Sequence, residues 1–314
     1  MTIGQTTPVL MRDAFLDELF EQARQNPDIY LLSADFGAKA LDRFREVLPD
    51  QFIHTGISEQ TMVDVGAGLA LMGKTVFLYA MAPFITARCY EQIKSVVSSM
   101  NLPITLLSVG VGLGYDHATL THFTPEDIAI MRALNGIEVV TATDAVSAQD
   151  LARRSCAAPR FRYVRLERAP LPTLYPTGFA EAWDDGFKVL APGRDLWIAA
   201  CGVMTHRALA AREALAAQGI DAGVIDVFRV KPLDGAKLAD AMGTVGRLLT
   251  VEEQLLEGGF GSALAETLMD AGRPMAQKRL GLRDGFVVEN GDRAHLHRLY
   301  GIDLADVVRA AAEW

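Results

Sequence analysis

Short apolar runs alternate along the chain with longer stretches in which apolar residues recur at helical spacing. In the first half the runs predict strands at 29–33, 75–79, 104–109, 137–141 and 161–166. In the second half they predict strands at 196–201, 222–227 and 248–252. Strands separated by helices cannot pair as hairpins, so they form a mostly parallel sheet. The pattern therefore predicts an α/β protein.

Helical periodicity predicts helices over 9–24, 58–72, 204–218 and 262–271. Ser58 stands at the N-cap position of the second of these helices. The segment Thr124-Pro125-Glu126-Asp127 combines an N-cap threonine, a first-turn proline and early acidic residues. We therefore expect another helix to begin in this segment, with Thr124 as its N-cap.

The stretch 169–185 interrupts this alternation. It is rich in proline, includes Gly178 and has no clear period, so we interpret it as a linker. It divides the 314 residues into domains 1–168 and 186–314, close to the usual size of about 150 residues per domain. The expected fold is two doubly wound domains, each with a mostly parallel sheet.

Composition argues against membranes and nucleic acid as partners. Half of the residues are apolar, but the longest apolar runs are far shorter than the roughly 20 residues of a membrane span. The first residues lack the pattern of a secretory signal, so we expect a cytoplasmic protein. Thirty basic and thirty-nine acidic residues give a net charge of −9, and no basic run suits nucleic acid.

The three cysteines, Cys89, Cys156 and Cys201, are widely separated and odd in number. This spacing fits neither a disulfide framework nor a zinc site. We interpret them as buried small apolar residues in a reducing compartment.

The stretch Phe52-Ile-His-Thr-Gly-Ile-Ser-Glu-Gln60 places a strand end, a turn at Gly56 and the carboxyl of Glu59 at the start of a helix. Ligands commonly bind at such strand ends in α/β sheets. Burial would raise the pKa of Glu59, whereas the helix N-terminus would lower it. A buried, protonated Glu59 would donate a hydrogen bond, while an exposed one would only complement the helix dipole. Both alternatives remain open from the residues alone.

The order of several motifs makes the chain resemble the transketolase and 1-deoxyxylulose-5-phosphate synthase family. The first are His54-Thr-Gly-Ile-Ser-Glu-Gln60 and Gly66-Ala-Gly-Leu-Ala70, which resemble the family's pyrimidine-binding domain. Further matching motifs in the first half are Ser33-Ala-Asp35, Arg88-Cys-Tyr-Glu-Gln-Ile93, Asn101-Leu-Pro103, Thr121-His122, Glu126-Asp-Ile-Ala-Ile-Met-Arg132 and Arg168-Ala-Pro-Leu-Pro172. Those that resemble the family's C-terminal domain are Asp226-Val-Phe-Arg-Val-Lys-Pro-Leu-Asp234, Val251-Glu-Glu253 and Gly258-Gly-Phe-Gly261.

The resemblance implies a thiamine diphosphate enzyme that lacks part of its cofactor site. The family binds the diphosphate and Mg²⁺ in another domain, through a Gly-Asp-Gly turn and a downstream asparagine. Here the Gly291-Asp292 pair is followed by Arg293. The resemblance therefore implies the C-terminal subunit of a split transketolase. A separate N-terminal subunit would hold Mg²⁺ and the diphosphate, in an α2β2 assembly.

The resemblance also assigns cofactor residues. It places Glu59, Asp35, Phe84, Ile57 and Arg88 against thiamine diphosphate. The family glutamate bonds a ring nitrogen of the aminopyrimidine and promotes its imino form, which leads to the carbanion nucleophile. Phe84 is the candidate for stacking on the pyrimidine. Asp35 as a helix cap and Phe84 as a core residue remain alternatives.

For the substrate, the resemblance gives His122 a catalytic position facing the donor sugar and makes His54 a further pocket residue. Arg168 matches the family arginine that clamps a sugar phosphate, a task that suits a planar guanidinium. A surface ion pair is the alternative for Arg168, and strand alternation points Arg165 to the other face. The family aspartate expected before His122 is replaced by Ala118.

These assignments predict transfer of a two-carbon ketol unit between sugar phosphates or close analogues. Two alternatives remain: the beta subunit of a 2-oxo acid dehydrogenase, and a non-catalytic regulatory paralogue.

Two other features are expected to be structural. The glycines of Gly258-Gly-Phe-Gly261 precede a helix that could hold an anion, although close packing is the preferred interpretation. His295 and His297 lack a third ligand nearby and are expected to be solvated or at an interface.

Overall fold

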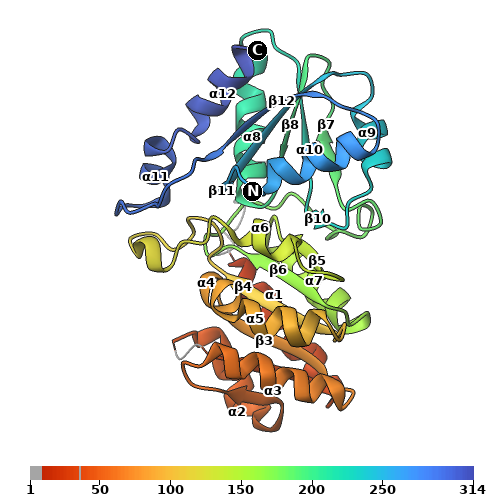
Figure 1. Ribbon diagram of the computed structural model, residues 1–314, viewed down its shortest axis with the longest axis vertical. Coiled ribbons are helices and arrows are strands. Elements are labelled where there is room, and N and C mark those ends of the chain that lie inside the picture. Colours follow the sequence, from red (N-terminus) through yellow and green to blue (C-terminus); the bar gives the residue numbers. More distant parts are fainter. Residues whose placement is uncertain (1–8, 35–36) are drawn as a thin grey trace, which may run out of the picture.

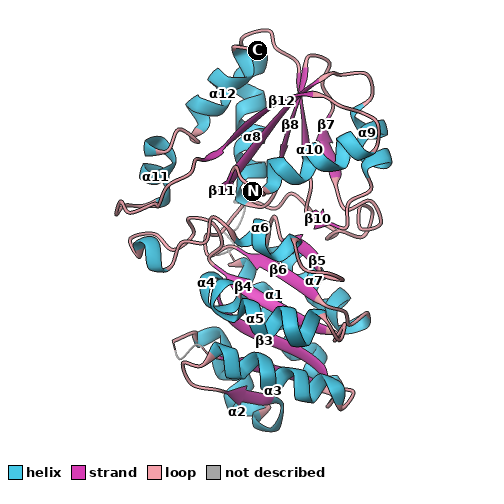
Figure 2. Cartoon of the chain, in the orientation of Figure 1, coloured by secondary structure: helices cyan, strands magenta, loops and turns pink. Residues whose placement is uncertain are grey.

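The computed structural model describes residues 9–34 and 37–314, and these form two lobes stacked along the long axis (Figure 1). The N-terminal lobe comprises the described residues up to 168 and the C-terminal lobe comprises residues 186–314. Each lobe is built on its own sheet, with helices around it (Figure 2). The segment between the lobes contains turns but no helix or strand.

The N-terminal lobe has a sheet of seven strands among the described residues, in the order β10-β5-β6-β4-β3-β1-β2. Its pairs are parallel except for β10, which runs antiparallel to β5 at one edge. The strands are β1 (Ile29–Ser33), β2 (Phe52–His54), β3 (Thr75–Met81), β4 (Ile104–Val109), β5 (Glu138–Thr141), β6 (Arg162–Leu166) and β10 (Arg229–Lys231).

Helices cover both faces of this sheet. Alternate strand residues point to opposite sides, and both sides carry apolar side chains that pack against helices. In β3, Phe77 and Tyr79 pack with α1 (Met11–Gln25) and α7 (Ala145–Ala157). Val76 and Leu78 instead pack with α3 (Glu59–Leu71). The remaining helical segments of the lobe are α2 (Asp42–Val47), α4 (Ala82–Ile85), α5 (Tyr90–Gln92), α6 (Asp127–Arg132), η1 (Lys39–Leu41), η2 (Pro49–Gln51), η3 (Ala87–Cys89), η4 (Ile93–Ser98) and η5 (Thr119–Thr121).

The C-terminal lobe has a five-stranded sheet in the order β12-β11-β8-β9-β7, with only β7 antiparallel to its neighbour among the strands described. Its strands are β7 (Lys188–Ala191), β8 (Leu196–Ala200), β9 (Ala222–Asp226), β11 (Arg247–Leu255) and β12 (Ala276–Leu282). Its helices are α8 (Val203–Ala216), α9 (Gly235–Met242), α10 (Phe260–Asp270), α11 (Arg293–Leu299) and α12 (Leu304–Ala312).

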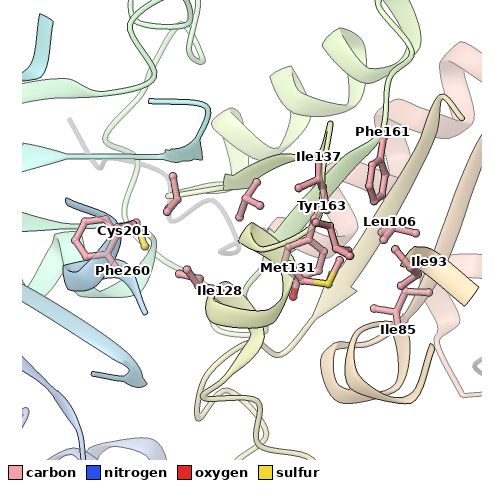
Figure 3. Packing of buried hydrophobic residues seen from close by; sticks show 14 of the residues in the cluster. Ile85, Ile93, Leu106, Ile128, Met131, Ile137, Phe161, Tyr163, Cys201 and Phe260 are labelled. Carbon is pink, nitrogen blue, oxygen red and sulfur yellow. The ribbon is translucent and has the colours of Figure 1, made fainter. Parts of the chain in front are cut away.

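The two lobes share one apolar cluster across their junction. Figure 3 shows Ile128 of α6 toward Cys201 and Phe260 of the C-terminal lobe and Met131 of the same helix toward Tyr163, all within one cluster. The strand β10 also crosses the junction, because it follows β9 in the sequence but pairs with β5. The lobes are therefore joined by both packing and hydrogen bonds.

A buried carboxylate lies at the same junction. Asp226 accepts hydrogen bonds from the hydroxyls of Thr143 at 2.7 Å, Tyr175 at 2.7 Å and Thr205 at 2.8 Å. Burial raises the pKa of Asp226 to about 6, although the three hydroxyl donors oppose that rise. Asp226 thus connects both lobes to the segment between them.

The strands and most helices predicted from the sequence are confirmed, with ends shifted by a few residues. The helix predicted at Thr124-Pro125-Glu126-Asp127 is confirmed as α6, which begins at Asp127, but its N-cap residue is Glu126 and not Thr124. Thr124 instead forms a β-bridge with Gly112. Within the described residues, no helix is long and apolar enough to span a membrane.

Candidate active site

The sequence-predicted residues that the structure describes come together at the carboxyl ends of the parallel strands. Glu59 starts α3 just after β2, and Phe84 and Arg88 follow β3 in α4 and η3. His122 lies in the segment after β4, and Arg168 lies just after β6. Strand ends on one edge of a parallel sheet converge, which is where α/β proteins bind ligands.

Glu59 is the buried carboxylate of this edge. Only 4 % of its surface is exposed, so the alternative of an exposed first-turn glutamate is wrong. Arg88 Nη1 donates a hydrogen bond of 2.8 Å to Glu59 Oε2. Ser58 occupies the N-cap position as predicted, but its hydroxyl donates to the carbonyl of Thr55 at 2.7 Å instead of capping the helix.

The helix that carries Glu59 lies close to the sheet because of Gly66. A Cβ at this position would lie 2.7 Å from Leu78 Cδ2, so a larger residue would push α3 away from β3. Glu59 is therefore held at the strand ends by close packing about two turns further along the helix.

Five side chains form a continuous row beside Glu59, which we call the aromatic row: Arg88, Phe84, His122, Tyr115 and Arg168. The Arg88 guanidinium lies 4.0 Å from the centre of the Phe84 ring, and that ring lies 5.4 Å from His122. The His122 ring lies 5.5 Å from Tyr115, and the Arg168 guanidinium lies 4.4 Å above the Tyr115 ring. Such cation–π contacts orient a guanidinium without neutralising it.

Phe84 is half-buried and lies at this edge, so its position differs from that of the fully buried core residues. The alternative of Phe84 as a core residue is therefore not supported by its surroundings. His122 is also half-buried, and its Nδ1 lies 2.8 Å from the hydroxyl of Thr121.

Tyr115 is a member of the row that the sequence does not predict, although a neighbouring glycine carries a signal for it. Gly110 has a φ of +75°, and a Cβ there would lie 2.1 Å from the Tyr115 ring. The sequence shows a glycine-rich loop at this point, but only the structure shows which ring occupies the space.

Two other sequence-predicted residues, His54 and Ile57, precede Glu59 in the chain and differ in exposure. His54 is half-buried at the end of β2, and its Nδ1 accepts a hydrogen bond of 3.2 Å from the Gly56 amide. Ile57 is 77 % exposed. Asp35 lies outside the described residues.

Arg168 and Arg165 have different surroundings, as strand alternation predicts. Arg165 is buried, and its Nε donates to Asp127 Oδ2 at 2.7 Å, so it is already paired inside the lobe. Arg168 is exposed and has no acidic partner among the described residues. The alternative of a surface ion pair for Arg168 is therefore not supported in this part of the chain.

Two structural expectations are resolved in the C-terminal lobe. The helix N-terminus after Gly258 and Gly259 does hold an anion, the protein's own Glu252, which accepts from the amides of Phe260 at 2.6 Å and Gly261 at 2.8 Å. Burial raises the pKa of Glu252 to about 8, against the effect of those amides. His297 is not solvated: it is buried and bonds Glu253.

A cavity of about 320 Å³ lies on another side of the loop that carries His122. It is lined mainly by apolar side chains, among them Leu120, Phe123 and Phe286, and includes none of the sequence-predicted site residues. Within residues 9–34 and 37–314, no group of three His, Cys, Asp or Glu side chains is placed to hold a metal ion.

Comparison with known proteins identifies the family of both domains. Residues 7–173 match the transketolase pyrimidine binding domain and residues 186–307 match the transketolase C-terminal domain. The chain is 34% identical over 307 residues to one of the subunits of the apulose-4-phosphate transketolase of Phocaeicola vulgatus, covering 98% of this chain and 97% of that one. It is also 34% identical over 310 residues to the 6-deoxy-6-sulfo-D-fructose transketolase subunit SqwH of a Clostridium species, covering 96% and 94%.

Among solved structures, the chain is similar to one described as a split gene transketolase, inactive beta4 tetramer. The TM-score is 0.86 at 30% sequence identity, and the match covers 97% of this chain and 98% of that chain. The two matched domains account for nearly the whole chain, and the full-length relatives are transketolase subunits. The chain therefore belongs to the transketolase family and carries its pyrimidine-binding and C-terminal domains.

Proposed function

We propose that this chain is one subunit of a thiamine-diphosphate-dependent enzyme that transfers a two-carbon ketol unit between sugar phosphates or close analogues. It acts only with a separate subunit that supplies the diphosphate-binding domain. The observation that carries the proposal is the buried Glu59 carboxylate at the start of α3, beside an open row of aromatic and cationic side chains.

The residues around Glu59 fit the aminopyrimidine half of thiamine diphosphate. Arg88 bonds Oε2 of Glu59, which leaves Oε1 to bond a ring nitrogen. The half-buried Phe84 ring supplies a flat apolar surface, and Ile57 exposes an aliphatic one. When bound, thiamine diphosphate would supply the carbon acid that attacks a carbonyl, and Glu59 would exchange a proton with a ring nitrogen of the cofactor. His54 and Asp35 remain proposed neighbours of this site.

The diphosphate half of the cofactor is assigned to the partner. Mg²⁺ prefers oxygen ligands in near-octahedral geometry, and the described residues include no group of three His, Cys, Asp or Glu side chains placed to hold a metal ion. We assign Mg²⁺ and the diphosphate to the Gly-Asp-Gly turn of the separate N-terminal subunit.

The substrate is assigned to the opposite end of the row. His122 is oriented by Thr121 at Nδ1, so Nε2 is the ring atom that would meet a sugar hydroxyl. Arg168 presents an exposed guanidinium, which bonds two oxygens of a phosphate at once. The proposed site thus extends from Glu59, where the proton is placed, along the aromatic row to Arg168, where the phosphate is bound.

The exposed face of α3 is the proposed contact with the partner. Val65, Leu71 and Met72 are exposed apolar residues on this helix and its end, and a Cβ at Gly68 would meet no atom within 4 Å. A subunit that covers this face also approaches Glu59 at the start of the same helix. The names of the relatives, one an individual transketolase subunit and one an inactive beta4 tetramer, support a requirement for a second kind of chain. An α2β2 assembly is the proposed stoichiometry.

We also propose the domain division 1–168 and 186–314, joined by the linker 169–185. The two separate sheets support it, and β10 is the exception that belongs to the second domain in sequence but to the first sheet in pairing. The proposed location is the cytoplasm, where a reducing environment suits the free thiols of Cys89, Cys156 and Cys201.

The experiment that tests the proposed function is reconstitution with a co-expressed N-terminal subunit. Ketol transfer that needs thiamine diphosphate is the expected activity. Oxidative decarboxylation of a 2-oxo acid would favour the dehydrogenase alternative. A complex that forms but has neither activity would favour the regulatory alternative.

A further inference from the structure

Three buried ionisable side chains and the half-buried Arg293 form a cluster where the two lobes meet. Arg293, the first residue of α11, donates to both oxygens of Glu167, at 2.7 and 3.0 Å. The same guanidinium bonds both oxygens of Glu253, with Nε at 2.6 Å from Oε1. His297 bonds Glu253 from one turn further along α11. We call Glu167, Glu253, Arg293 and His297 the lobe-junction cluster.

The cluster is shielded from water. Glu167 is 2 % exposed, Glu253 3 % and His297 1 %. Burial raises the pKa of Glu253, but the charges of Arg293 and His297 outweigh burial and hold this pKa well below its usual range. A guanidinium that holds two carboxylates in two bidentate pairs fixes their positions as well as their charges.

One carboxylate of the cluster adjoins the proposed phosphate clamp. Glu167 lies between Leu166, the last residue of β6, and Arg168. The carbonyl of Leu166 accepts a hydrogen bond of 3.0 Å from the Gly110 amide. The Glu167 side chain is anchored by Arg293 from the C-terminal lobe. Because adjacent residues share a peptide plane, this anchor restricts the backbone from which the Arg168 side chain extends.

The second carboxylate supports the loop that carries the rest of the row. Gly112 packs against Glu253 so closely that a Cβ there would lie 2.7 Å from Glu253 Oε2. Gly112 forms a bridge with Thr124, which closes the segment 112–124 around Tyr115 and His122. The base of this loop therefore rests on a side chain that Arg293 holds in place.

Other bonds attach the same loop to the C-terminal lobe. The His117 amide donates to the carbonyl of Gly291 at 3.1 Å, and its ring lies 3.1 Å from Asn290 Oδ1. The Leu255 amide donates to the carbonyl of Pro125 at 2.9 Å. Figure 1 shows α11 at the side of the C-terminal lobe that borders the junction. The C-terminal lobe thus contacts the loop on both sides of His122 in the sequence.

We propose that Arg293 is a positioning residue for the substrate end of the site, acting through Glu167 on Arg168 and through Glu253 on the loop of Tyr115 and His122. This inference rests on the proposed function for its kinetic consequence. It gives the C-terminal lobe a specific role: Arg293 sets the distance at which Arg168 stacks on Tyr115, and hence where a phosphate is bound.

The first test uses amide hydrogen exchange of the chain itself and requires no activity. Arg293→Lys keeps the charge but loses the two bidentate pairs with Glu167 and Glu253. Backbone amides in 110–124 should therefore exchange about tenfold faster, which corresponds to a decrease of about 1.4 kcal/mol in the free energy of local opening. Glu167→Gln keeps the shape and should loosen mainly the residues around Arg168. The matched control is Arg132→Lys, because Arg132 also joins the lobes, through Glu266 and the carbonyl of Gly258.

The control should leave exchange in 110–124 unchanged. Unchanged exchange there in Arg293→Lys, or equal acceleration throughout the chain, would overturn the positioning role. If Arg293→Lys does not fold, Glu167→Gln decides in its place, and unchanged exchange around Arg168 would count against the proposal.

The second test uses the reconstituted complex and compares a phosphorylated ketose donor with an uncharged short donor. Arg293→Lys should raise the ratio of their KM values by roughly 3- to 100-fold, the range of couplings between contacting residues. In an Arg168→Ala background the same substitution should leave the ratio unchanged, because its route to the phosphate is gone. An equal rise in both backgrounds, or no rise in either, would contradict the proposal.

The two tests separate two failures. If the wild-type complex transfers no ketol unit, the proposed function fails, while hydrogen exchange still decides whether Arg293 positions the loop.

Discussion

Arg88 and Glu59 form an ion pair in which the carboxylate is buried and the guanidinium reaches the surface. Their contact is 2.8 Å, with Glu59 4 % exposed and the Arg88 side chain 42 % exposed. The same guanidinium lies on the Phe84 ring. A charge that is removed from water needs such a partner, because an isolated buried carboxylate is costly. The pair thus links the proposed proton-placing residue to the aromatic row.

Glu59→Gln should reduce ketol transfer by the reconstituted enzyme by roughly 10²- to 10⁴-fold, the usual contribution of acid–base catalysis. The amide keeps the shape and can still accept from Arg88, so thiamine diphosphate affinity should change little. Turnover, cofactor affinity and proton exchange at the thiazolium carbon are the measurements. Near-normal proton exchange in the variant would contradict the role of Glu59.

Arg168→Ala should raise KM for phosphorylated substrates by roughly one to two orders of magnitude. A charge-assisted hydrogen bond contributes about 1.5–3 kcal/mol, and each 1.4 kcal/mol is tenfold. Arg168→Lys should recover only part of this loss, because an ammonium lacks the planar fork. Steady-state kinetics with an uncharged donor provide the control. Equal losses for charged and uncharged donors would assign Arg168 a structural role.

Asp226 should make the protein less stable as the pH rises from about 4 to 6. Its pKa is raised from 3.8 to about 6, so the folded state binds its proton more tightly than the unfolded state in this window. The shift of about two units corresponds to about 3 kcal/mol. Chemical unfolding at several pH values, compared between wild type and Asp226→Asn, isolates this contribution. If the free energy of unfolding changes with pH by the same amount in the wild type and in Asp226→Asn, the proposed contribution of Asp226 is contradicted.

The three cysteines should react slowly with thiol reagents in the folded chain at pH 8. Burial raises the pKa of Cys89, Cys156 and Cys201 to about 12 each, and the thiolate is the reactive form. In denaturant all three should react. Rapid modification of the folded chain at pH 8 would show that at least one thiol is more accessible than the structure places it.

The elements of the fold could be predicted wherever local pattern and burial agree. The strand β4 is buried at every position and most of its residues are apolar, so the sequence predicts both of its ends correctly. The strand β10 has only three residues at a sheet edge, and its pairing with β5 is set by the contact between lobes. A short edge strand of this kind carries little local signal.

The start of α6 shows how tertiary contacts override local preference. Thr124 and Pro125 have the composition of a helix start, but Thr124 is engaged in its bridge with Gly112. Asp127 is the first residue of α6 and also holds the buried Arg165. The N-cap of the helix is therefore Glu126, two residues later than the composition indicates.

Some residues of the candidate site could likewise be predicted from the sequence, and others could not. Glu59, Phe84 and His122 could be found from the motifs around them, and the structure brings them to one edge of the sheet. Tyr115 and Arg293 could not be found, because their contacts join segments that are far apart in the sequence. Of the two alternatives for His297, solvated or at an interface, the first is wrong for the same reason, since its partner Glu253 is 44 positions away.

The central claim is that this chain provides the pyrimidine-binding half of a site that another subunit completes. Its most direct test is ketol transfer measured with thiamine diphosphate and Mg²⁺, for the purified chain alone and for the chain mixed with a subunit carrying the Gly-Asp-Gly turn. We expect no turnover from the chain alone and robust turnover from the mixture, lost again when Glu59→Gln replaces the wild type. Robust turnover by the chain alone would contradict the claim.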